Sequence, residues 1–503
     1  MIMIGKLAVL LVVFFVLTIA SSDVLDNEVN GCNLPTELKA EIASYGPTVN
    51  RIIDALTNGK FKGGVYNDLA NFVDKFGARL SGTKNLENSI DYMLDLMKNR
   101  SLENVHGEHA MIPHWQRGDE SGELLEPRKA KIGVLSLGSS VGTPSGSIQA
   151  EVLVVRSFEE LEQANFSQAA KGKIVVFNFQ FESYGKSVAY RGQGATQAAK
   201  HGAVAALIKS VTPYSQYTLH TGEQQYGNNV TKIPAVSITV EDARMLQRYQ
   251  DRGQKIVIKL KTHTHSHPDS PSRNVVGEIV GSAKPEKIVL VSGHIDSWDV
   301  GVGAMDDGGG AFISWYALNV LKSLGLRARR TIRSVLWTAE EPGLIGAQAY
   351  NKAHASELKD HIFVMESDEG TFTPLGIEYN AGPKGGCIIQ EILKLLSSIN
   401  TTQSSYADAV GSDITIWAGQ IPGGSLLNDN DKYFYYHHSA ADTMDVLDPD
   451  SLDKATALWA SVAFIIADLK DEFPRDFKKD TLNDSVLLKK LKNSSQQRPR
   501  SPL

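Results

Sequence analysis

Histidine and carboxylate side chains follow several strand-like segments in the second half of the sequence, and together they have the chemistry of a metal site. They are His294, Asp296, Asp306, Asp307, Glu340, Glu341, Asp368, His437, His438 and Asp442. Imidazole nitrogens and carboxylate oxygens are good ligands for zinc, and a set of this size suits two zinc ions. Because two of the glutamates are adjacent, one can bind metal while the other holds a water molecule.

Each of these groups alone also has a purely structural interpretation. Asp306 and Asp307 could cap the helix that follows them, since aspartate is a good N-terminal cap. The adjacent glutamates could form a solvated first helical turn, and the histidines could be core, loop or turn residues. The metal interpretation is favoured because all of these groups converge on loops at the ends of predicted strands.

Strands alternate with helices in this half of the chain. The predicted strands are Asn274–Val280, Lys287–Ser292, Thr331–Trp337 and His361–Met365, and the predicted helices are 308–325, 343–355, 385–398 and 452–469. This alternation predicts an α/β fold with a mainly parallel mixed sheet flanked by helices. Ligand sites in such folds lie at the carboxyl ends of the strands, which is where the histidines and carboxylates occur.

The first half of the chain has a different pattern of predicted secondary structure. Residues 47–100 have the apolar spacing of amphipathic helices. Residues 128–262 consist of short β-rich runs separated by turns, with few long helices. The polar stretch His263–Pro271 is typical of an exposed linker. Its alternating histidines could also form a second metal site, but the linker is the favoured interpretation. Residues 471–503 are polar, which predicts a solvated or loosely docked tail.

Composition limits the classes of function. The chain has 503 residues, 42% of them hydrophobic, and a net charge of −6. It can bury a large core, and it has no electrostatic reason to bind nucleic acid or an anionic membrane. Two cysteines, Cys32 and Cys387, exclude a disulfide scaffold and a cysteine zinc finger. They could form one disulfide or remain two free thiols, and no partner residues for a cysteine nucleophile are evident.

Residues 1–22 have the pattern of a secretory signal peptide. One lysine precedes the apolar run Leu7–Ile19, and small residues follow it. The run is too short for a membrane span, although it could instead be a buried N-terminal helix. Six Asn-X-Ser/Thr sites agree with secretion, namely Asn99, Asn165, Asn229, Asn400, Asn483 and Asn493. We therefore expect a secreted glycoprotein without a membrane anchor in its mature form; the lysosome, endoplasmic reticulum or Golgi lumen are alternative destinations.

The motifs resemble those of the di-zinc aminopeptidase and glutamate-carboxypeptidase family over about residues 45–470. They are His294-x-Asp296, Gly303-Ala304-x-Asp306-Asp307, Glu340-Glu341, Glu366-Ser367-Asp368 and His438. The resemblance implies that His294 and Asp368 bind one of two zinc ions per chain, that Glu341 and His438 bind the other, and that Asp306 bridges them. It also implies that Glu340 is the general base and that Asp296 orients a ligand histidine. From the residues alone His437 and His438 cannot be distinguished.

The same resemblance implies the domain organisation. The peptidase domain would comprise residues 45–127 and 273–470, with a protease-associated domain inserted over 128–262. Residues 23–44 fall where the family carries a propeptide, which would make the chain a zymogen. The implied protein is a homodimer.

The implied activity is that of a zinc metallo-exopeptidase, a carboxypeptidase or dipeptidase. It would hydrolyse small peptides, mainly dipeptides with free termini, through a zinc-bridging water activated by Glu340. Two alternatives remain within the family: an aminopeptidase for longer peptides and an N-terminal glutaminyl cyclase. A third is a non-catalytic binding protein that uses the same fold without metals. The complete set of five ligands and Glu340 disfavours that third alternative.

Overall fold

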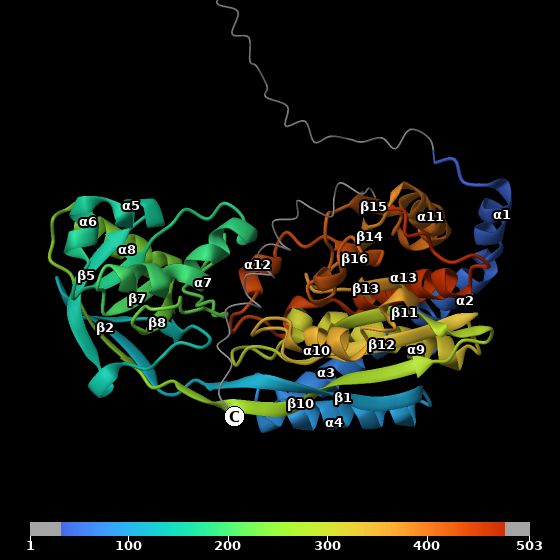
Figure 1. Cartoon of the computed structure of the whole chain (residues 1–503), viewed down its shortest axis with the longest axis horizontal. Coiled ribbons are helices and arrows are strands. Elements are labelled where there is room, and N and C mark those ends of the chain that lie inside the picture. Colours follow the sequence, from blue (N-terminus) through green and yellow to red (C-terminus); the bar gives the residue numbers. More distant parts are fainter. Residues whose placement is uncertain (1–31, 478–503) are drawn as a thin grey trace, which may run out of the picture. The chain divides into compact units, whose positions relative to one another are not determined.

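Two mixed sheets organise residues 32–477, which are the residues that the structure, a computed structural model, describes (Figure 1). The first sheet has eight strands in the spatial order β1 (Glu103–Gln116), β10 (His265–Ile279), β12 (Arg330–Trp337), β11 (Lys284–His294), β13 (His361–Glu366), β16 (Gly423–Asn428), β14 (Pro374–Asn380) and β15 (Gln403–Tyr406). Its centre, from β12 through β11 and β13 to β16, is parallel. The predicted strands and the predicted sheet class are confirmed.

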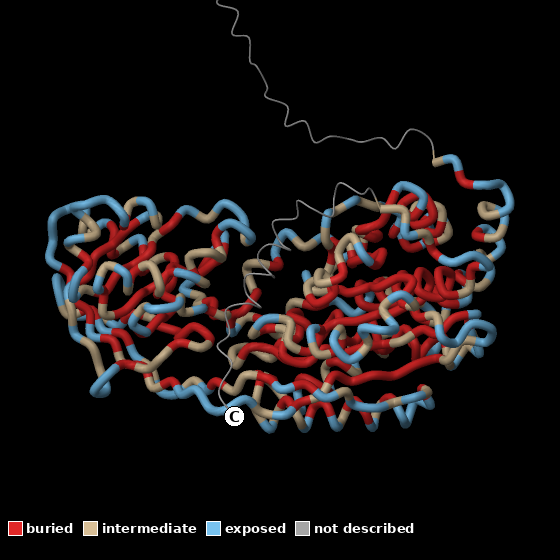
Figure 2. The backbone as a smooth tube through the Cα atoms, viewed as in Figure 1, coloured by how far each residue is buried: buried red, intermediate tan, exposed pale blue. Residues whose placement is uncertain are grey.

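Helices that flank the first sheet come from the segments before and after residues 120–262. They are α1 (Thr36–Ser44), α2 (Gly46–Thr57), α3 (Gly64–Phe76), α4 (Lys84–Asn99), α9 (Gly309–Ser323), α10 (Ile345–Ala353), α11 (Pro383–Leu393), α12 (Tyr433–Tyr436) and α13 (Pro449–Asp468). The α13 helix begins where the Asp448 carboxylate accepts a hydrogen bond from the Ser451 N–H at 2.8 Å. Nearly all of its residues are buried, and it packs against α9, α2 and β11 (Figure 2).

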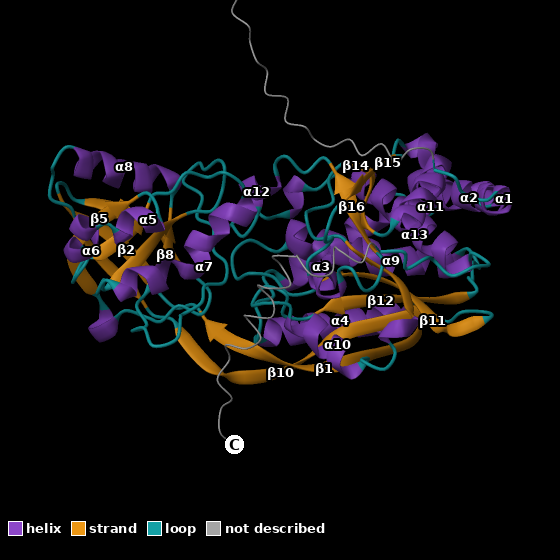
Figure 3. Cartoon of the chain, turned by 45° about the horizontal axis from the view of Figure 1, so that its top comes forward, coloured by secondary structure: helices purple, strands orange, loops and turns teal. Residues whose placement is uncertain are grey.

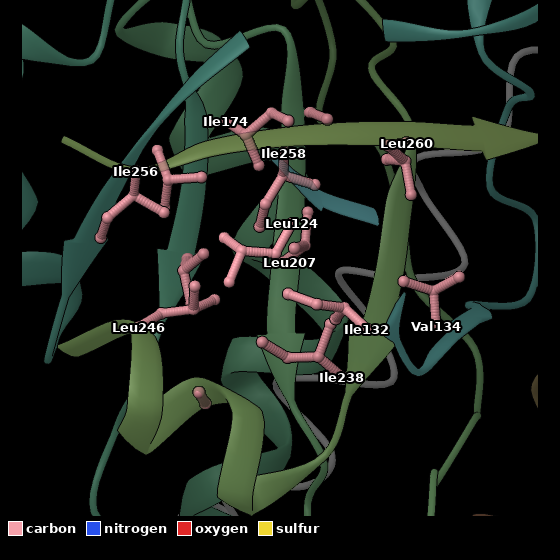
Figure 4. Close-up of a cluster of buried hydrophobic side chains, with 14 of the residues drawn as sticks. Leu124, Ile132, Val134, Ile174, Leu207, Ile238, Leu246, Ile256, Ile258 and Leu260 are labelled. Carbon is pink, nitrogen blue, oxygen red and sulfur yellow. The ribbon is translucent and has the colours of Figure 1, made fainter. Parts of the chain in front are cut away.

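The second sheet forms the part that we call the inserted domain, residues 120–262. Its strands, in spatial order, are β3 (Ala130–Ile132), β2 (Glu120–Glu126), β9 (Val257–Thr262), β5 (Ile148–Val155), β6 (Ile174–Phe177), β7 (Ala205–Lys209), β8 (Ala235–Ile238) and β4 (Val134–Ser136). The strand β2 precedes the predicted boundary at residue 128. Apolar side chains of this sheet, including Leu124, Leu207 and Ile258, pack with Leu246 from a helix to form the core of the domain (Figure 4).

The inserted domain also contains helices that the sequence analysis did not predict. They are α5 (Phe158–Glu162), α6 (Ala164–Ala169), α7 (Tyr184–Lys200) and α8 (Val240–Asp251). The longest of them, α7, has 17 residues. The buried face of α7 carries small or polar residues, among them Ser187, Arg191 and Gly194, so no apolar periodicity marks the helix.

The stretch His263–Pro271 is not a linker, because most of it belongs to β10. Between Ser266 and Ser272 this strand pairs with β1 alone, whereas β12 pairs with it only from Val275 onward. The two strands therefore form a ribbon, exposed along β10, that continues into β2 and β9 of the second sheet (Figure 3). Prolines are tolerated here because one edge of β10 has no partner strand. The polar composition reflects solvent exposure of the ribbon.

The chain ends are only partly described. Residues 471–477 are docked, contrary to the prediction of a loose tail: Phe473 is buried against Phe363, and Arg475 donates hydrogen bonds to the carbonyls of Leu358 and Lys359. Residues 478–503 and the predicted signal peptide lie outside the described residues. Within residues 32–477, no helix has both the length and the hydropathy of a membrane span.

Both cysteines are engaged. Cys32 and Cys387 are disulfide-bonded, so the alternative of two free thiols is wrong. Of the predicted propeptide, residues 32–44 are described and include α1, whose Glu41 carboxylate accepts a hydrogen bond from the Lys470 N–H at 2.7 Å.

Candidate metal centre

The five predicted ligands meet at the carboxyl ends of the parallel strands. His294 is the last residue of β11, and its Nε2 atom lies 3.1 Å from Oδ1 of Asp306 and 3.2 Å from Oδ1 of Asp368, which follows β13. Glu341 follows β12, and its Oε2 atom lies 2.9 Å from Nε2 of His438. All five side chains are buried or nearly so.

Asp306 lies between these two groups. Its Oδ1 atom faces His294, and its Oδ2 atom lies 3.3 Å from Nε2 of His438. The residue belongs to a short turn before α9, the Asp306–Asp307 peptide is cis, and Asp442 accepts hydrogen bonds from the Asp306 N–H at 3.2 Å and from the Met305 N–H at 2.7 Å. A carboxylate in this position can contact two cations at once.

The His437–His438 pair can be distinguished by geometry. The two rings are stacked at 3.6 Å. His438 contacts both Glu341 and Asp306, whereas His437 approaches Asp306 alone, at 3.5 Å. His438 is therefore the better placed of the two to share a cation with Glu341.

Asp296 lies against His294, and it contacts the turn of the two glutamates as well. The Nδ1 atom of His294 lies 3.0 Å from the backbone carbonyl of Asp296 and 3.6 Å from its carboxylate. The carboxylate also accepts hydrogen bonds from the N–H groups of Glu340 at 3.0 Å and Glu341 at 3.3 Å. The main chain of Asp296 is thus the closer partner of the histidine, and its side chain also fixes the turn that carries both glutamates.

Two further residues hold these loops: Asp307, which the sequence analysis lists among the candidate carboxylates, and Arg79, which it does not single out. Asp307 accepts hydrogen bonds from the N–H groups of His294 and Gly310, both at 3.0 Å. The buried Arg79 guanidinium donates to the carbonyls of Ile295, Val302 and Gly303. Arg79 follows α3 closely in the sequence, within the segment Phe76–Thr83. Nothing in that segment indicates that its side chain supports the loops of the site.

Glu340 is held by a loop from a distant part of the chain. The hydroxyl of Ser412 donates a hydrogen bond to Oε1 of Glu340. The loop itself is anchored to Glu366 on β13, whose Oε2 atom accepts from the Ser412 N–H at 2.8 Å and from the Ile414 N–H at 3.0 Å. No motif in the sequence marks Ser412.

The electrostatics of the cluster favour a bound cation. Burial raises the pKa of Glu341 to about 7 and raises that of Asp368 well above its usual range. Against the effect of burial, nearby carboxylates raise the pKa of His294 and of His438 well above the usual value. Carboxylates packed this densely in a buried site are stabilised by a positive charge among them.

Two orphaned atoms test whether metal ions fit the site. Oδ2 of Asp306 and Oε1 of Glu341 are buried and have no hydrogen-bond partner. An oxygen in this state costs free energy unless a cation or donor reaches it. The nitrogen and oxygen donors around Asp306 form the kind of set that zinc prefers, so the residues present fit a pair of zinc ions.

Comparisons with known proteins agree with this geometry. Residues 274–463 match the model of peptidase family M28, and residues 148–246 match that of the PA domain, which lies within the inserted domain. Carboxypeptidase Q of Xenopus laevis is 52% identical over 87% of this chain and 93% of its own length, and that of Homo sapiens is 51% identical over the same shares.

Solved structures give the same result for the fold. The peptidase M28 precursor of Shewanella amazonensis has a TM-score of 0.81 at 29% identity, over 86% of this chain and 99% of its own. A zinc aminopeptidase of Bacillus subtilis has a TM-score of 0.63 at 20% identity, over 84% and 99%. The second similarity concerns the fold alone.

Proposed function

Because the chain belongs to peptidase family M28 and has carboxypeptidase Q proteins among its relatives, we propose that it is a zinc-dependent metallo-exopeptidase that hydrolyses small peptides. The observation that carries this proposal is the position of Asp306 between two histidine–carboxylate groups, with Glu340 beside them. A non-catalytic binding protein would have no need for such a buried, charge-rich arrangement.

Five side chains would hold two zinc ions. His294 and Asp368 would bind one, Glu341 and His438 the other, and Asp306 both. When bound, zinc polarises the scissile carbonyl and lowers the pKa of the attacking water. His437, whose imidazole pairs with the Asp306 carboxylate but not with that of Glu341, would lie beside the site without binding metal.

Glu340 would move the protons. Its Oε1 atom accepts a hydrogen bond from the Ser412 hydroxyl, which leaves Oε2 for proton transfer. Oε2 would take a proton from the attacking water and then deliver it to the leaving amine. Burial raises the pKa of Glu340, which brings the carboxylate closer to the value that suits a base working near neutral pH. No serine or cysteine nucleophile is needed.

The substrates we propose are dipeptides with free termini, as the family resemblance implies. We propose further that the enzyme is secreted or lumenal, that it is a glycosylated homodimer, and that removal of residues 23–44 activates a zymogen. The disulfide-bonded state of Cys32 and Cys387 supports an oxidising compartment. The exposed positions of Asn99, Asn165 and Asn229 are compatible with glycosylation.

One experiment tests the enzymatic proposal. The purified protein is analysed for zinc by mass spectrometry and assayed against unblocked dipeptides, blocked dipeptides and a ten-residue peptide. We expect two zinc ions per chain and rapid hydrolysis of the unblocked dipeptides alone. Equal rates on the ten-residue peptide would favour an aminopeptidase instead. A protein without zinc and without hydrolysis would reject the proposal.

A further inference from the structure

Residues 220–222 of the inserted domain lie against the loop that carries His438. The Thr221 N–H donates a hydrogen bond to the His438 carbonyl at 2.9 Å, and His220 forms an antiparallel bridge with Ser439. The Nδ1 atom of His220 also lies 2.6 Å from the His437 carbonyl. The main chain at His438 is therefore fixed by a segment from the other domain.

The His438 side chain makes a contact of the same kind. Its Nε2 atom faces Glu341 and Asp306, whereas its Nδ1 atom lies 3.3 Å from the Thr221 carbonyl oxygen. An imidazole that offers Nε2 to a metal must carry its proton on Nδ1, and that proton needs an acceptor. We propose that the Thr221 carbonyl is this acceptor, so that the inserted domain supplies a positioning group for a zinc ligand. The inference rests on the proposed function.

Arg191 limits the alternatives for Nδ1. Its guanidinium NH1 group lies 3.4 Å from both Nδ1 of His438 and the Thr221 carbonyl oxygen. Arginine can only donate, so a bond from Arg191 to Nδ1 would place the imidazole proton on Nε2, where it would oppose metal binding. Among the described residues, the Thr221 carbonyl is the acceptor that lies within hydrogen-bond distance of Nδ1. Its two lone pairs can serve both His438 and Arg191.

The position of this carbonyl is fixed by both domains. The Thr221 hydroxyl donates to the Ser136 carbonyl at 3.0 Å and accepts from Arg117 at 3.2 Å. Arg117 in turn donates two hydrogen bonds of 2.7 Å to Asp299, in the loop that follows β11. Gly222 has a φ of +135°, and a Cβ atom there would lie 2.3 Å from Cζ of Arg191. A side chain at position 222 would therefore push against Arg191, which also donates to the Thr221 carbonyl, and it would strain the main chain next to that carbonyl.

The test compares Gly222→Ala with Gly253→Ala. Both glycines lie in the inserted domain at positive φ, but a Cβ atom at Gly253 would meet open space. Zinc affinity is measured by competition with a chelator, and melting temperatures are measured with and without zinc. We expect Gly222→Ala to bind one of its two zinc ions about 10- to 100-fold more weakly. Its zinc-dependent rise in melting temperature should shrink, whereas Gly253→Ala should retain both the affinity and the rise.

The possible failures are distinguishable. A Gly222→Ala protein that binds both zinc ions as tightly as the wild type overturns the inference alone. A wild-type protein that binds no zinc overturns the proposed function and the inference with it.

If Gly222→Ala does not fold, Thr221→Val replaces it. That variant loses the hydroxyl that anchors the carbonyl, and Thr221→Ser keeps it. We expect zinc to bind several-fold more weakly to Thr221→Val and normally to Thr221→Ser. Equal affinities in the two variants would contradict the inference.

Discussion

The hydroxyl of Ser412 donates a hydrogen bond to Oε1 of Glu340. The two residues lie on different loops, and the loop of Ser412 is in turn anchored to the buried Glu366. One oxygen of the proposed general base is therefore fixed in direction, while the other is left for the reacting water. The contact makes Ser412 a positioning residue for Glu340.

Replacement of Ser412 by alanine tests this relationship. We expect Ser412→Ala to lower kcat by roughly 10- to 100-fold, because a hydrogen bond to a charged group is worth roughly 1.5–3 kcal/mol. KM and zinc content should change little. The matched control is Ser412→Thr, which keeps the hydroxyl and should retain most of the turnover. Unchanged kcat in Ser412→Ala would show that the hydrogen bond has no part in catalysis.

Glu340 and Glu341 are neighbours in the chain but have separate contacts, with Ser412 and His438 respectively. Glu341→Gln should weaken zinc binding, because a neutral amide is a poorer zinc ligand than a carboxylate. Glu340→Gln should keep both zinc ions and lose a factor on the order of 10²–10⁴ in kcat. Zinc content and turnover of the two variants are measured side by side. The opposite pattern would exchange the two roles.

Removal of zinc should abolish hydrolysis and leave a folded protein. Dialysis against a chelator is expected to remove both ions, and added zinc should restore turnover. The loops that carry the ligands are held by hydrogen bonds that involve no metal, such as the one that Asp307 accepts from the His294 N–H and the one that Arg79 donates to the Ile295 carbonyl. Circular dichroism and the assay are recorded before and after. Activity that survives complete removal of zinc would contradict the proposed chemistry.

A second histidine–carboxylate cluster, remote from the metal centre, predicts how stability depends on pH. Nε2 of His354 lies 3.1 Å from Glu108, and Nδ1 lies 3.0 Å from Glu357. The hydrogen bond to Glu108 raises the pKa of His354 above its unfolded value of roughly 6.5. Protonated His354 therefore stabilises the folded state below that pH, and this stabilisation is lost as the pH rises through the raised pKa.

His354→Gln should accordingly lower the free energy of unfolding more at about pH 5.5 than at about pH 9, by roughly 1–2 kcal/mol. Urea titrations at the two pH values measure the difference. The exposed His265 provides the control, since His265→Gln removes a histidine without removing this cluster. A loss that is the same at both pH values would show that protonation of His354 contributes nothing.

The convergence of the proposed metal ligands could be predicted from the sequence because most of them follow strands that end at one edge of a sheet, and because side-chain type indicates which chemistry they could support. Other parts of the site carry no such signal. The contact of Thr221 with His438 joins residues 217 positions apart and is made by a backbone carbonyl, which any residue has. Likewise, Asp296 was identified as a functional residue, but the sequence could not show that its main chain rather than its carboxylate is the closer partner of His294.

The ribbon of β1 and β10 carries the chain into and out of the inserted domain as hydrogen-bonded neighbours, with Ile112 opposite Ser270. Cutting the chain at these two residues would leave ends about one strand spacing apart, roughly 5 Å, a gap that a two-residue hairpin turn closes. A whole domain could therefore be gained or lost in a single genetic event without rebuilding the first sheet. The loop at His438 is held by hydrogen bonds with Thr221. In an ancestor without the insertion, other residues would have had to hold that loop.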